Sequence, residues 1–357
     1  MNNIARIQAE LVKNDLDALL IFDEKNQRFA AGFPFTDGAV IVAREKAWLL
    51  TDSRYIEAAE KAAGGCACVQ MFDQQHPLMS LIKAALAEAK VERLGAEEES
   101  LSYARWANLE RLLGVKLQGA QSILRTLRAS KTDEEIQSMI RAQRISEKAL
   151  EEVLQIIKPG MTEREVMAEL VYHMLKNGSE GNSFDPIVVT GKKTSMPHGV
   201  PGDEVIRAGD FITMDFGSLK DGYCSDMTRT VAVGYATEEM RNVYDIVLKA
   251  QLAGIAAARA GIPGKEIDAA ARKVITEAGY GPYFGHGFGH SLGLDIHEPP
   301  FAGPTGEAPM AEGDLCSAEP GIYLPGKFGV RIEDVMILRS TGAEVITKAP
   351  KMELIVL

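Results

Sequence analysis

Apolar runs and amphipathic stretches alternate along the first 120 residues of the chain. Each apolar run has the length of a buried strand, and each amphipathic stretch has the apolar spacing that is typical of a surface helix. The predicted strands span 17–22, 39–43 and 47–52. The predicted helices span 4–11, 53–63, 76–95 (with the start of a further strand) and 101–114. We therefore expect this region to form an α/β layer of its own.

One long helical pattern follows. It begins at Leu124 and stops at Pro159-Gly160, with Thr132 or Asp133 as a suitable N-cap. A chain of 357 residues fits two domains at roughly 100 to 200 residues each. Placing the boundary at the start of this pattern predicts domains at 1–124 and 125–357.

Helical and strand patterns then recur in a coarse repeat. The expected helices span 163–177, 237–260 and 264–279, and the expected strands span 185–190, 211–216, 224–233, 285–297, 315–319 and 330–338. Two halves emerge, each with a helix pair and a hairpin. This order predicts an α+β domain with pseudo-twofold character, in which helices flank a sheet on one side.

The composition narrows the possible functions. The net charge is −11, and no dense run of lysine and arginine could follow a phosphate backbone, so we expect no nucleic-acid partner. No apolar segment of about 18 residues and no secretory signal pattern occur, which predicts a cytoplasmic protein without a membrane partner. The four cysteines are too few and too scattered for a disulfide framework.

Two aspartates flank a turn sequence, LKDG, between strand-like runs. A hairpin is expected. If Lys220-Asp221 form the loop, Asp215 lies directly opposite Asp226. If the loop is Asp221-Gly222, the pairing slips by two residues and both aspartates still share one face. Opposed carboxylates repel each other unless a cation lies between them, so either register points to a metal.

Two glutamates repeat this arrangement. Glu319 and Glu333 are placed symmetrically about Gly326, so a turn there puts both carboxylates on one face. Both lie among apolar residues, where an isolated carboxylate would pay several kcal/mol of desolvation. Arg331 would share the face of Glu333, where it either pairs with a ligand carboxylate or forms a surface ion pair.

Three of the six histidines lie within one glycine-rich stretch, GHGFGHSLGLDIHEPP. They are His286, His290 and His297. The last two are seven residues apart, an odd spacing that a straight strand cannot place on one face, so a bend or bulge near Gly293 is implied. His198 lies on a loop before the first hairpin and is grouped with them.

The combined set predicts a two-metal hydrolase. Four carboxylates with one imidazole suit hard or borderline divalent ions such as Mn, Co or Zn. Without metal the carboxylates would repel one another strongly. The candidate ligands are Asp215, Asp226, His290, Glu319 and Glu333.

Motifs spread over almost the whole chain support this chemistry. They are NSFDPIVVTG, PHG, GDFITMDFG, GYCSDMTRTVAVG, GHGFGHSLGLDIHE, AEPGIY and GVRIED, preceded by NQRFAAGFPFTDGAVIV and LLTDSRYIEAA. In this order they resemble the pita-bread metallopeptidases, in particular the Xaa-Pro group that contains prolidase and aminopeptidase P. The resemblance implies a creatinase-like N-terminal domain and a C-terminal pita-bread domain.

The resemblance also implies roles for the ligands. Asp215 would hold one metal ion, Asp226 and Glu333 would bridge two, and His290 with Glu319 would hold the second. Glu319 would also take a proton from the attacking water. Manganese is the expected metal, with cobalt or zinc as alternatives.

The remaining candidates would contact substrate or support the ligands. His198 and His297 resemble the family's substrate-contacting and proton-handling histidines, and His286 and Arg331 resemble residues that either support the metal ligands or line the substrate pocket. The segment after His297, EPPFAGPTG, lacks the arginine with which some dipeptidases of the family hold a dipeptide's free carboxylate.

We therefore expect a cytoplasmic homodimer that hydrolyses the bond between an N-terminal residue and proline in dipeptides or short peptides. Three alternatives remain open. Methionine aminopeptidase shares the ligands but usually lacks this N-terminal domain, and metal-free creatine amidinohydrolase shares both domains. A catalytically inactive, protein-interacting relative is the third.

Overall fold

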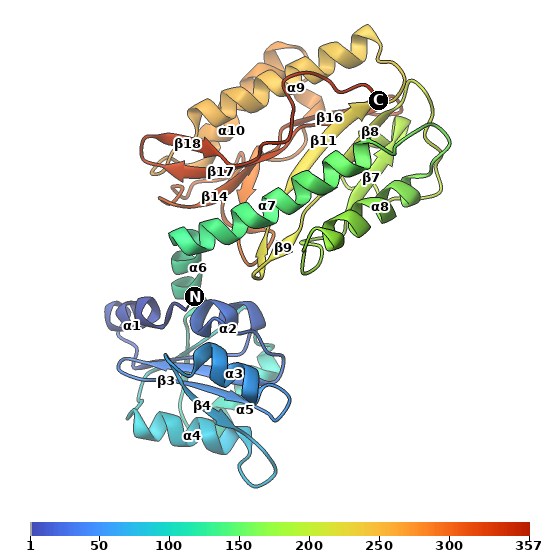
Figure 1. Ribbon diagram of the computed structural model, residues 1–357. Helices are drawn as coiled ribbons and strands as arrows, with labels where there is room; N and C mark the ends of the chain where they lie inside the picture. Colours follow the sequence, from blue (N-terminus) through green and yellow to red (C-terminus); the bar gives the residue numbers. More distant parts are fainter. Residues whose placement is uncertain (1) are drawn as a thin grey trace. The chain divides into compact units, whose positions relative to one another are not determined.

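A six-stranded mixed sheet forms the centre of the N-terminal unit in the computed structural model, which describes residues 2–357 (Figure 1). The strand order is β4-β3-β2-β1-β5-β6, with β1–β2 and β2–β3 antiparallel and the other pairs parallel. The strands are β1 (Ala18–Ile21), β2 (Gly38–Ala43), β3 (Ala47–Thr51), β4 (Cys68–Met71), β5 (Leu94–Ala96) and β6 (Leu117–Gly119).

Helices alternate with most of these strands along the chain. They are α1 (Ile4–Lys13), α2 (Glu24–Ala31), α3 (Ile56–Ala63), α4 (Leu78–Glu88), α5 (Tyr103–Leu113) and α6 (Gln121–Ala129). The strands and helices predicted here are confirmed, including the end of α5 at Gly114, whose φ of 72° closes the helix in the left-handed conformation.

The sequence pattern missed α2, β4 and β6. In α2 the buried face carries polar residues, so no apolar stripe marks it. Asn26 donates from Nδ2 to Glu97 Oε1 (2.7 Å), and Gln27 donates from Nε2 to the carbonyl oxygen of Phe22 (3.2 Å). Because hydrogen bonds rather than an apolar stripe hold this face, hydrophobic periodicity could not reveal the helix.

The single long helix expected at 124–160 is wrong. Two helices replace it, α6 and α7 (Asp133–Leu154). Thr132 is the N-cap of α7 and forms a capping box with Glu135, so a new helix begins there. The chain divides into two compact units between Arg128 and Ala129. The domain boundary expected after residue 124 stays a prediction.

The C-terminal unit contains two halves of similar construction. In one, α7 and α8 (Glu163–Lys176) pack together and cover the sheet β11-β8-β7, with a shared apolar core. In the other, α9 (Glu238–Ala257) and α10 (Gly264–Glu277) pack together and cover the sheet β13-β12-β14-β17-β18. The expected α+β domain with pseudo-twofold character is confirmed (Figure 1).

Short elements complete this unit. The strands are β7 (Ile187–Thr190), β8 (Phe211–Phe216), β9 (Leu219–Lys220), β10 (Tyr223–Cys224), β11 (Met227–Ala232), β12 (Gly289–Ser291), β13 (Glu298–Ala302), β14 (Leu315–Ala318), β15 (Gly321–Leu324), β16 (Phe328–Arg331), β17 (Asp334–Arg339) and β18 (Gly342–Val345). Two 3₁₀ helices are η1 (Gly191–Ser195) and η2 (Gly281–Tyr283).

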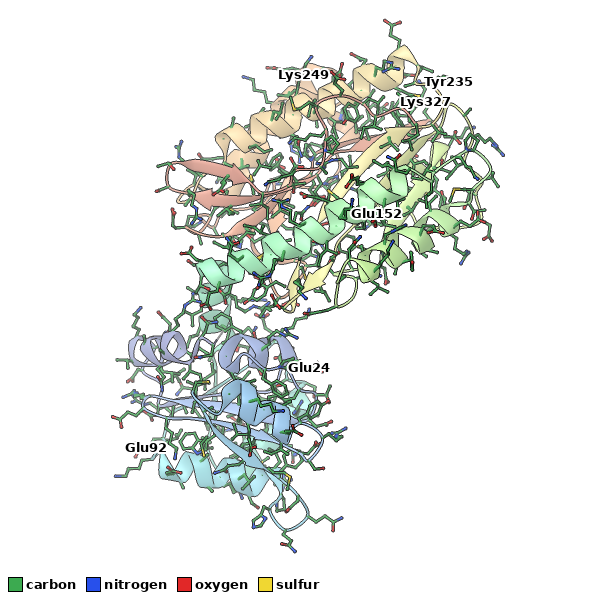
Figure 2. All side chains as sticks on the ribbon, viewed as in Figure 1. Glu24, Glu92, Glu152, Tyr235, Lys249 and Lys327 are labelled. Atoms are coloured by element: carbon green, nitrogen blue, oxygen red, sulfur yellow. The ribbon has the colours of Figure 1, made fainter. Side chains whose placement is uncertain are left out.

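Polar side chains link neighbouring helices at the surface of this unit. Glu152 of α7, labelled in Figure 2, accepts a hydrogen bond from Asn177 just after α8 (2.8 Å) and shares one with His173 of α8 (2.7 Å). Among residues 2–357, no helix has both the length and the apolar character that crossing a bilayer requires.

Candidate metal centre and cavity

The first hairpin places both aspartates on one face. In β8 and β11, Asp215 pairs with Thr228, and the same register continues into β9 and β10. The loop is therefore Asp221-Gly222, whose φ values of 52° and 77° are typical of a type I′ turn. This is the second of the two registers expected from the sequence. Asp226 lies two residues before Thr228, so its side chain points to the side of Asp215.

The second hairpin places both glutamates on one face in the same way. Ala318 pairs with Asp334 in β14 and β17, and Gly321 pairs with Arg331 in β15 and β16. Both pairings are symmetric about Gly326, as predicted. The ladder is interrupted between them, at the residues that include Glu319 and Glu333.

The histidine segment differs from expectation. The strand predicted at 285–297 is wrong, because only β12 is extended there and the chain bends from residue 293 to 297. The pairing of β12 with β13 also shifts between His290 and Ser291. The bend implied near Gly293 is confirmed. As a result the rings of His290 and His297 meet edge to face, with centroids 4.3 Å apart.

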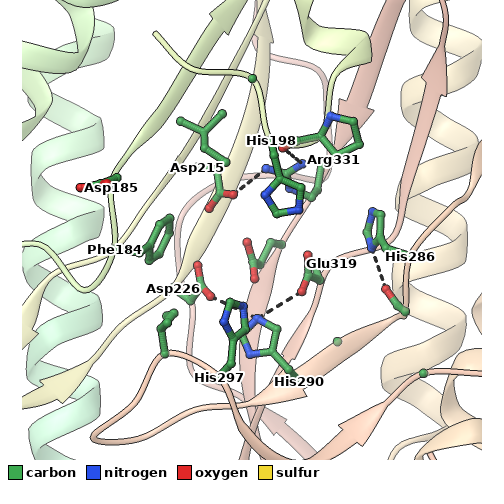
Figure 3. A pocket seen from close by; sticks show the side chains of 18 of the residues that line it. Phe184, Asp185, His198, Asp215, Asp226, His286, His290, His297, Glu319 and Arg331 are labelled. Atoms are coloured by element: carbon green, nitrogen blue, oxygen red, sulfur yellow. Dashed lines mark hydrogen bonds and ion pairs between the residues drawn. The ribbon is translucent and has the colours of Figure 1, made fainter. Parts of the chain in front are cut away.

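All the candidate site residues line one cavity of about 700 Å³ (Figure 3). They come from both hairpins, the histidine segment and the loop after η1. The nine residues are His198, Asp215, Asp226, His286, His290, His297, Glu319, Arg331 and Glu333. The folded chain thus brings together residues that are up to 135 positions apart in sequence.

A potential metal site lies at the centre of this group. Asp226, His290 and Glu333 are buried, and each offers one ligand atom within 4.8 Å of the others. His290 Nε2 lies 3.6 Å from Asp226 Oδ2 and 3.3 Å from Glu319 Oε1. Figure 3 shows Asp226, His290 and Glu319 converging on the same space.

The donor set fits divalent cations. Among the described residues, Asp215 Oδ1 and Asp226 Oδ1 are buried oxygen atoms without a hydrogen-bond partner. A buried polar atom left in this way costs about 1 to 3 kcal/mol, and more when the group is charged. Carboxylate oxygens and one imidazole nitrogen are ligands that Mn, Co and Zn accept. A cation would therefore satisfy the orphaned oxygens and offset the clustered charge.

The protonation equilibria of these side chains point the same way. Burial, and then the neighbouring carboxylates, raise the pKa of Asp226 and of Glu333 well above the ordinary range. Burial opposes the charge on His290 and Glu319, but their mutual hydrogen bond and attraction hold the pKa of His290 at about 9 and that of Glu319 at about 2. Without a metal, protons must supply part of the missing positive charge.

Two supporting side chains were not found from the sequence. Thr228 donates from Oγ1 to Glu333 Oε2 (2.7 Å). Ser317 donates from Oγ to Glu319 Oε1 (3.2 Å) and accepts from the backbone N–H of His290 (3.0 Å). Each lies two residues from a candidate ligand on the same strand face, which is the signal that could have revealed them.

Arg331 pairs with a candidate ligand. Its Nη2 lies 2.5 Å from Asp215 Oδ2, and its other donors contact Tyr323 Oη (3.0 Å) and Thr228 Oγ1 (3.0 Å). Of the two interpretations of Arg331, the pairing with a candidate ligand carboxylate is the one observed. The pair is buried rather than at the surface.

His286 lies at the other side of the cavity. Its Nε2 is 2.9 Å from Tyr323 Oη, and burial lowers the pKa of the ring, which favours the neutral form. His198 and His297 are exposed at the cavity, where a ligand could reach both rings.

This fold and this group of side chains define a metallopeptidase. The model of metallopeptidase family M24 matches residues 137–340, and that of the creatinase/prolidase N-terminal domain matches residues 3–130. The chain belongs to family M24, and the resemblance noted from the motifs is confirmed.

Relatives and solved structures match over nearly the full length. The chain is 35% identical to an Xaa-Pro dipeptidase of Pyrococcus horikoshii, over 95% of each chain. It is similar to the structure of an Xaa-Pro dipeptidase from Bacillus anthracis, with 40% identity, 99% of each chain covered and a TM-score of 0.94. An X-Pro aminopeptidase from Thermotoga maritima matches with 34% identity, 99% of this chain and 100% of that one covered, and a TM-score of 0.93.

Proposed function

We propose that this protein is a metal-dependent exopeptidase that hydrolyses the bond between an N-terminal residue and proline in dipeptides or short peptides. The convergence of four carboxylates and one imidazole on a single cavity carries the proposal. The relatives named as Xaa-Pro dipeptidases support the substrate class. An Xaa-Pro bond has no N–H for a general peptidase to grip, so a dedicated site is needed.

Five residues would hold two divalent ions. Asp215 would bind one ion, Asp226 and Glu333 would bridge both, and His290 with Glu319 would bind the second. When bound, the ions supply Lewis acidity that activates water and stabilises negative charge on the scissile carbonyl oxygen. We propose manganese as the resident metal, with cobalt or zinc as alternatives.

The surrounding side chains would handle substrate and protons. Glu319 would accept the proton of the attacking water, because its carboxylate is ionised near neutral pH. His198 and His297 face the cavity and would steady the intermediate or protonate the departing proline nitrogen. Arg331 holds Asp215 in place, and neutral His286 contributes to the substrate pocket.

Loss of His198 or His297 should stop turnover without removing metal. We expect His198→Ala and His297→Ala each to lower kcat by about 100-fold or more, the usual contribution of a positioned acid or base. Metal content of the purified variants should equal that of the wild type, since neither ring is part of the central ligand cluster. His76→Ala, which alters a histidine on a loop of the N-terminal unit, is the control. Stoichiometric loss of metal would instead make these histidines ligands.

Substrate length should matter little. Among the described residues that line the cavity, Arg331 is the single guanidinium, and it is bonded to Asp215. A free clamp for a dipeptide carboxylate is thus missing, and such a charge-assisted bond is typically worth about 1.5 to 3 kcal/mol.

We therefore expect Xaa-Pro tripeptides to be cleaved with a kcat/KM at least equal to that of the matched dipeptide. An Xaa-Pro amide and the free dipeptide should also differ by less than about threefold, well below the roughly tenfold or greater effect of a clamp. Activity confined to the free dipeptide would contradict this prediction.

One assay tests the function as a whole. An Xaa-Pro dipeptide, a longer Xaa-Pro peptide and a Met-Ala peptide are compared with Mn, Co or Zn added to metal-free protein. Cleavage of Met-Ala alone would indicate methionine aminopeptidase activity, and cleavage of none would favour the amidinohydrolase or inactive alternatives. We further propose a cytoplasmic homodimer, which light scattering and cell fractionation would test.

A further inference from the structure

A buried glutamine of α9 contacts the second hairpin where its ladder is interrupted. Gln251 is fully buried and donates from Nε2 to the carbonyl oxygens of Ala318 (2.9 Å) and Ile332 (3.1 Å). These two residues immediately precede Glu319 and Glu333. Both protons of one amide group are therefore used to hold the backbone at the two glutamates.

The interruption explains why such a contact is needed. The β14–β17 ladder ends at Ala318 and Asp334, and the β15–β16 ladder begins at Gly321 and Arg331. A buried carbonyl oxygen without a donor costs about 1 to 3 kcal/mol. A glutamine amide carries two donors, one for each of these two carbonyl oxygens.

The amide has one chemically sensible orientation. Lys351 Nζ donates to Gln251 Oε1 (2.6 Å). A flipped amide would set its oxygen against two carbonyl oxygens and its N–H₂ group against an ammonium group. Lys351 also contacts Asp334, which follows Glu333 in the chain.

Close packing brings α9 within reach of the hairpin. Gly254, one turn after Gln251, lies against Phe288, because an added Cβ there would come within 2.3 Å of the Phe288 ring. The carbonyl oxygen of Phe288 in turn accepts from the backbone N–H of Glu319 (2.8 Å). The helix, the histidine segment and the glutamate hairpin are thus fixed to one another at this point.

We propose that Gln251 is a positioning residue that sets the spacing between the carboxylates of Glu319 and Glu333, and with it the affinity of the site for its divalent ions. Gln251 does not line the cavity, so it acts through these two backbone carbonyls and through Lys351. The inference rests on the proposed metal centre, in which both glutamates are ligands.

Two substitutions of the full-length protein test this role. Gln251→Glu keeps the size of the side chain and an oxygen for Lys351 but removes the donors to both carbonyls. Gln251→Met removes all polar contacts without adding charge. Because the first adds a negative charge and the second does not, a shared effect cannot come from charge alone.

The matched control is Gln143→Met. Gln143 of α7 is also a fully buried glutamine on a long helix, but its amide atoms have no hydrogen-bond partner among the described residues. The two methionine variants therefore make the same chemical change at a buried site on a helix. Only Gln251 contacts the backbone next to Glu319 and Glu333.

Calorimetric titration of metal-stripped protein with Mn²⁺ gives the main measurement. We expect both Gln251 variants to bind at least one ion about 10- to 100-fold more weakly than the wild type, the usual effect of losing a residue that orients ligands. The electron paramagnetic resonance spectrum of the Mn²⁺ pair should change, and kcat should fall with little change in KM. Gln143→Met should bind Mn²⁺ within about threefold of the wild type.

Each other outcome is decisive. Wild-type Mn²⁺ affinity and spectrum in both Gln251 variants would overturn the inference, even if their melting temperatures fall, because only a structural role would then remain. A wild-type protein that binds fewer than two ions would contradict the proposed dinuclear centre instead. In that case the ratio between variant and wild-type affinities still tests the role of Gln251.

Discussion

Asp226→Asn should abolish turnover while the protein stays folded. The substitution keeps the shape of the side chain but removes a charge from the proposed bridging position, where burial and neighbouring carboxylates already disfavour ionisation in the absence of a cation. The two ions are expected to contribute several kcal/mol of transition-state stabilisation, so kcat/KM should fall by about 1000-fold or more. Metal analysis should show fewer than two ions per chain.

The same hairpin offers a control. Asp221→Asn makes an identical change at the turn, where asparagine tolerates the positive φ of 52°. Asp221 pairs with Arg141 at the surface, so this variant should keep both its metal and its activity. Equal activity of Asp226→Asn and wild type would show that the cavity does not work through a bridging carboxylate.

Lys131→Met should cause a large loss of stability. Lys131 is buried with its Nζ 2.8 Å from Asp314 Oδ1 and 3.4 Å from Glu298 Oε2. Removing one member of a buried ion cluster leaves uncompensated charge, which typically costs about 3 to 5 kcal/mol. Urea unfolding of the metal-stripped protein measures this cost.

The loss should depend on pH. Burial raises the pKa of Asp314 to about 6 from 3.8, even with Lys131 nearby. A folded-state pKa above the unfolded value means that ionisation opposes folding, and removal of the cation raises this pKa further. The variant should therefore be less impaired at pH 5, where Asp314 is protonated, than at pH 8.

Lys148→Met serves as the comparison. Lys148 forms an exposed pair with Glu151 on α7, so its loss should leave the stability almost unchanged at either pH. A similar small cost for Lys131→Met would show that the buried cluster contributes no net stability. The cluster also contacts Ser291 through Asp314, so loosening it should disturb the segment that follows His290.

The hairpins show how much of the site can be predicted from sequence. Side-chain alternation has a period of two, and the turn sequence sets the register, so the shared faces of the two carboxylate pairs follow from local rules. The symmetric turn at Gly326 was predicted uniquely. For the aspartates two registers were open, because the choice between Lys220-Asp221 and Asp221-Gly222 depends on which residues adopt positive φ.

The broken helix at 130–132 and the bend after β12 mark where local patterns are insufficient. The helical periodicity of α6 continues into α7, so the pattern alone did not reveal the stop. Two contacts are found at this stop. Thr132 forms the capping box of α7, and Lys131 pairs with Asp314, 183 residues away. The strand predicted through Gly293 failed because backbone bending here depends on pairing with β13.

The sequence by itself determined the two-domain α+β organisation and the faces on which the four carboxylates lie, and it predicted the ligand set, because composition, spacing and alternation are local properties of the chain. Only the tertiary structure decided the polar contacts that hold these ligands. Arg331 meets Asp215 across 116 residues, and Gln251 meets Ile332 across 81. Buried hydrogen bonds are satisfied by whichever group the fold brings near, and no pattern within one segment encodes that partner.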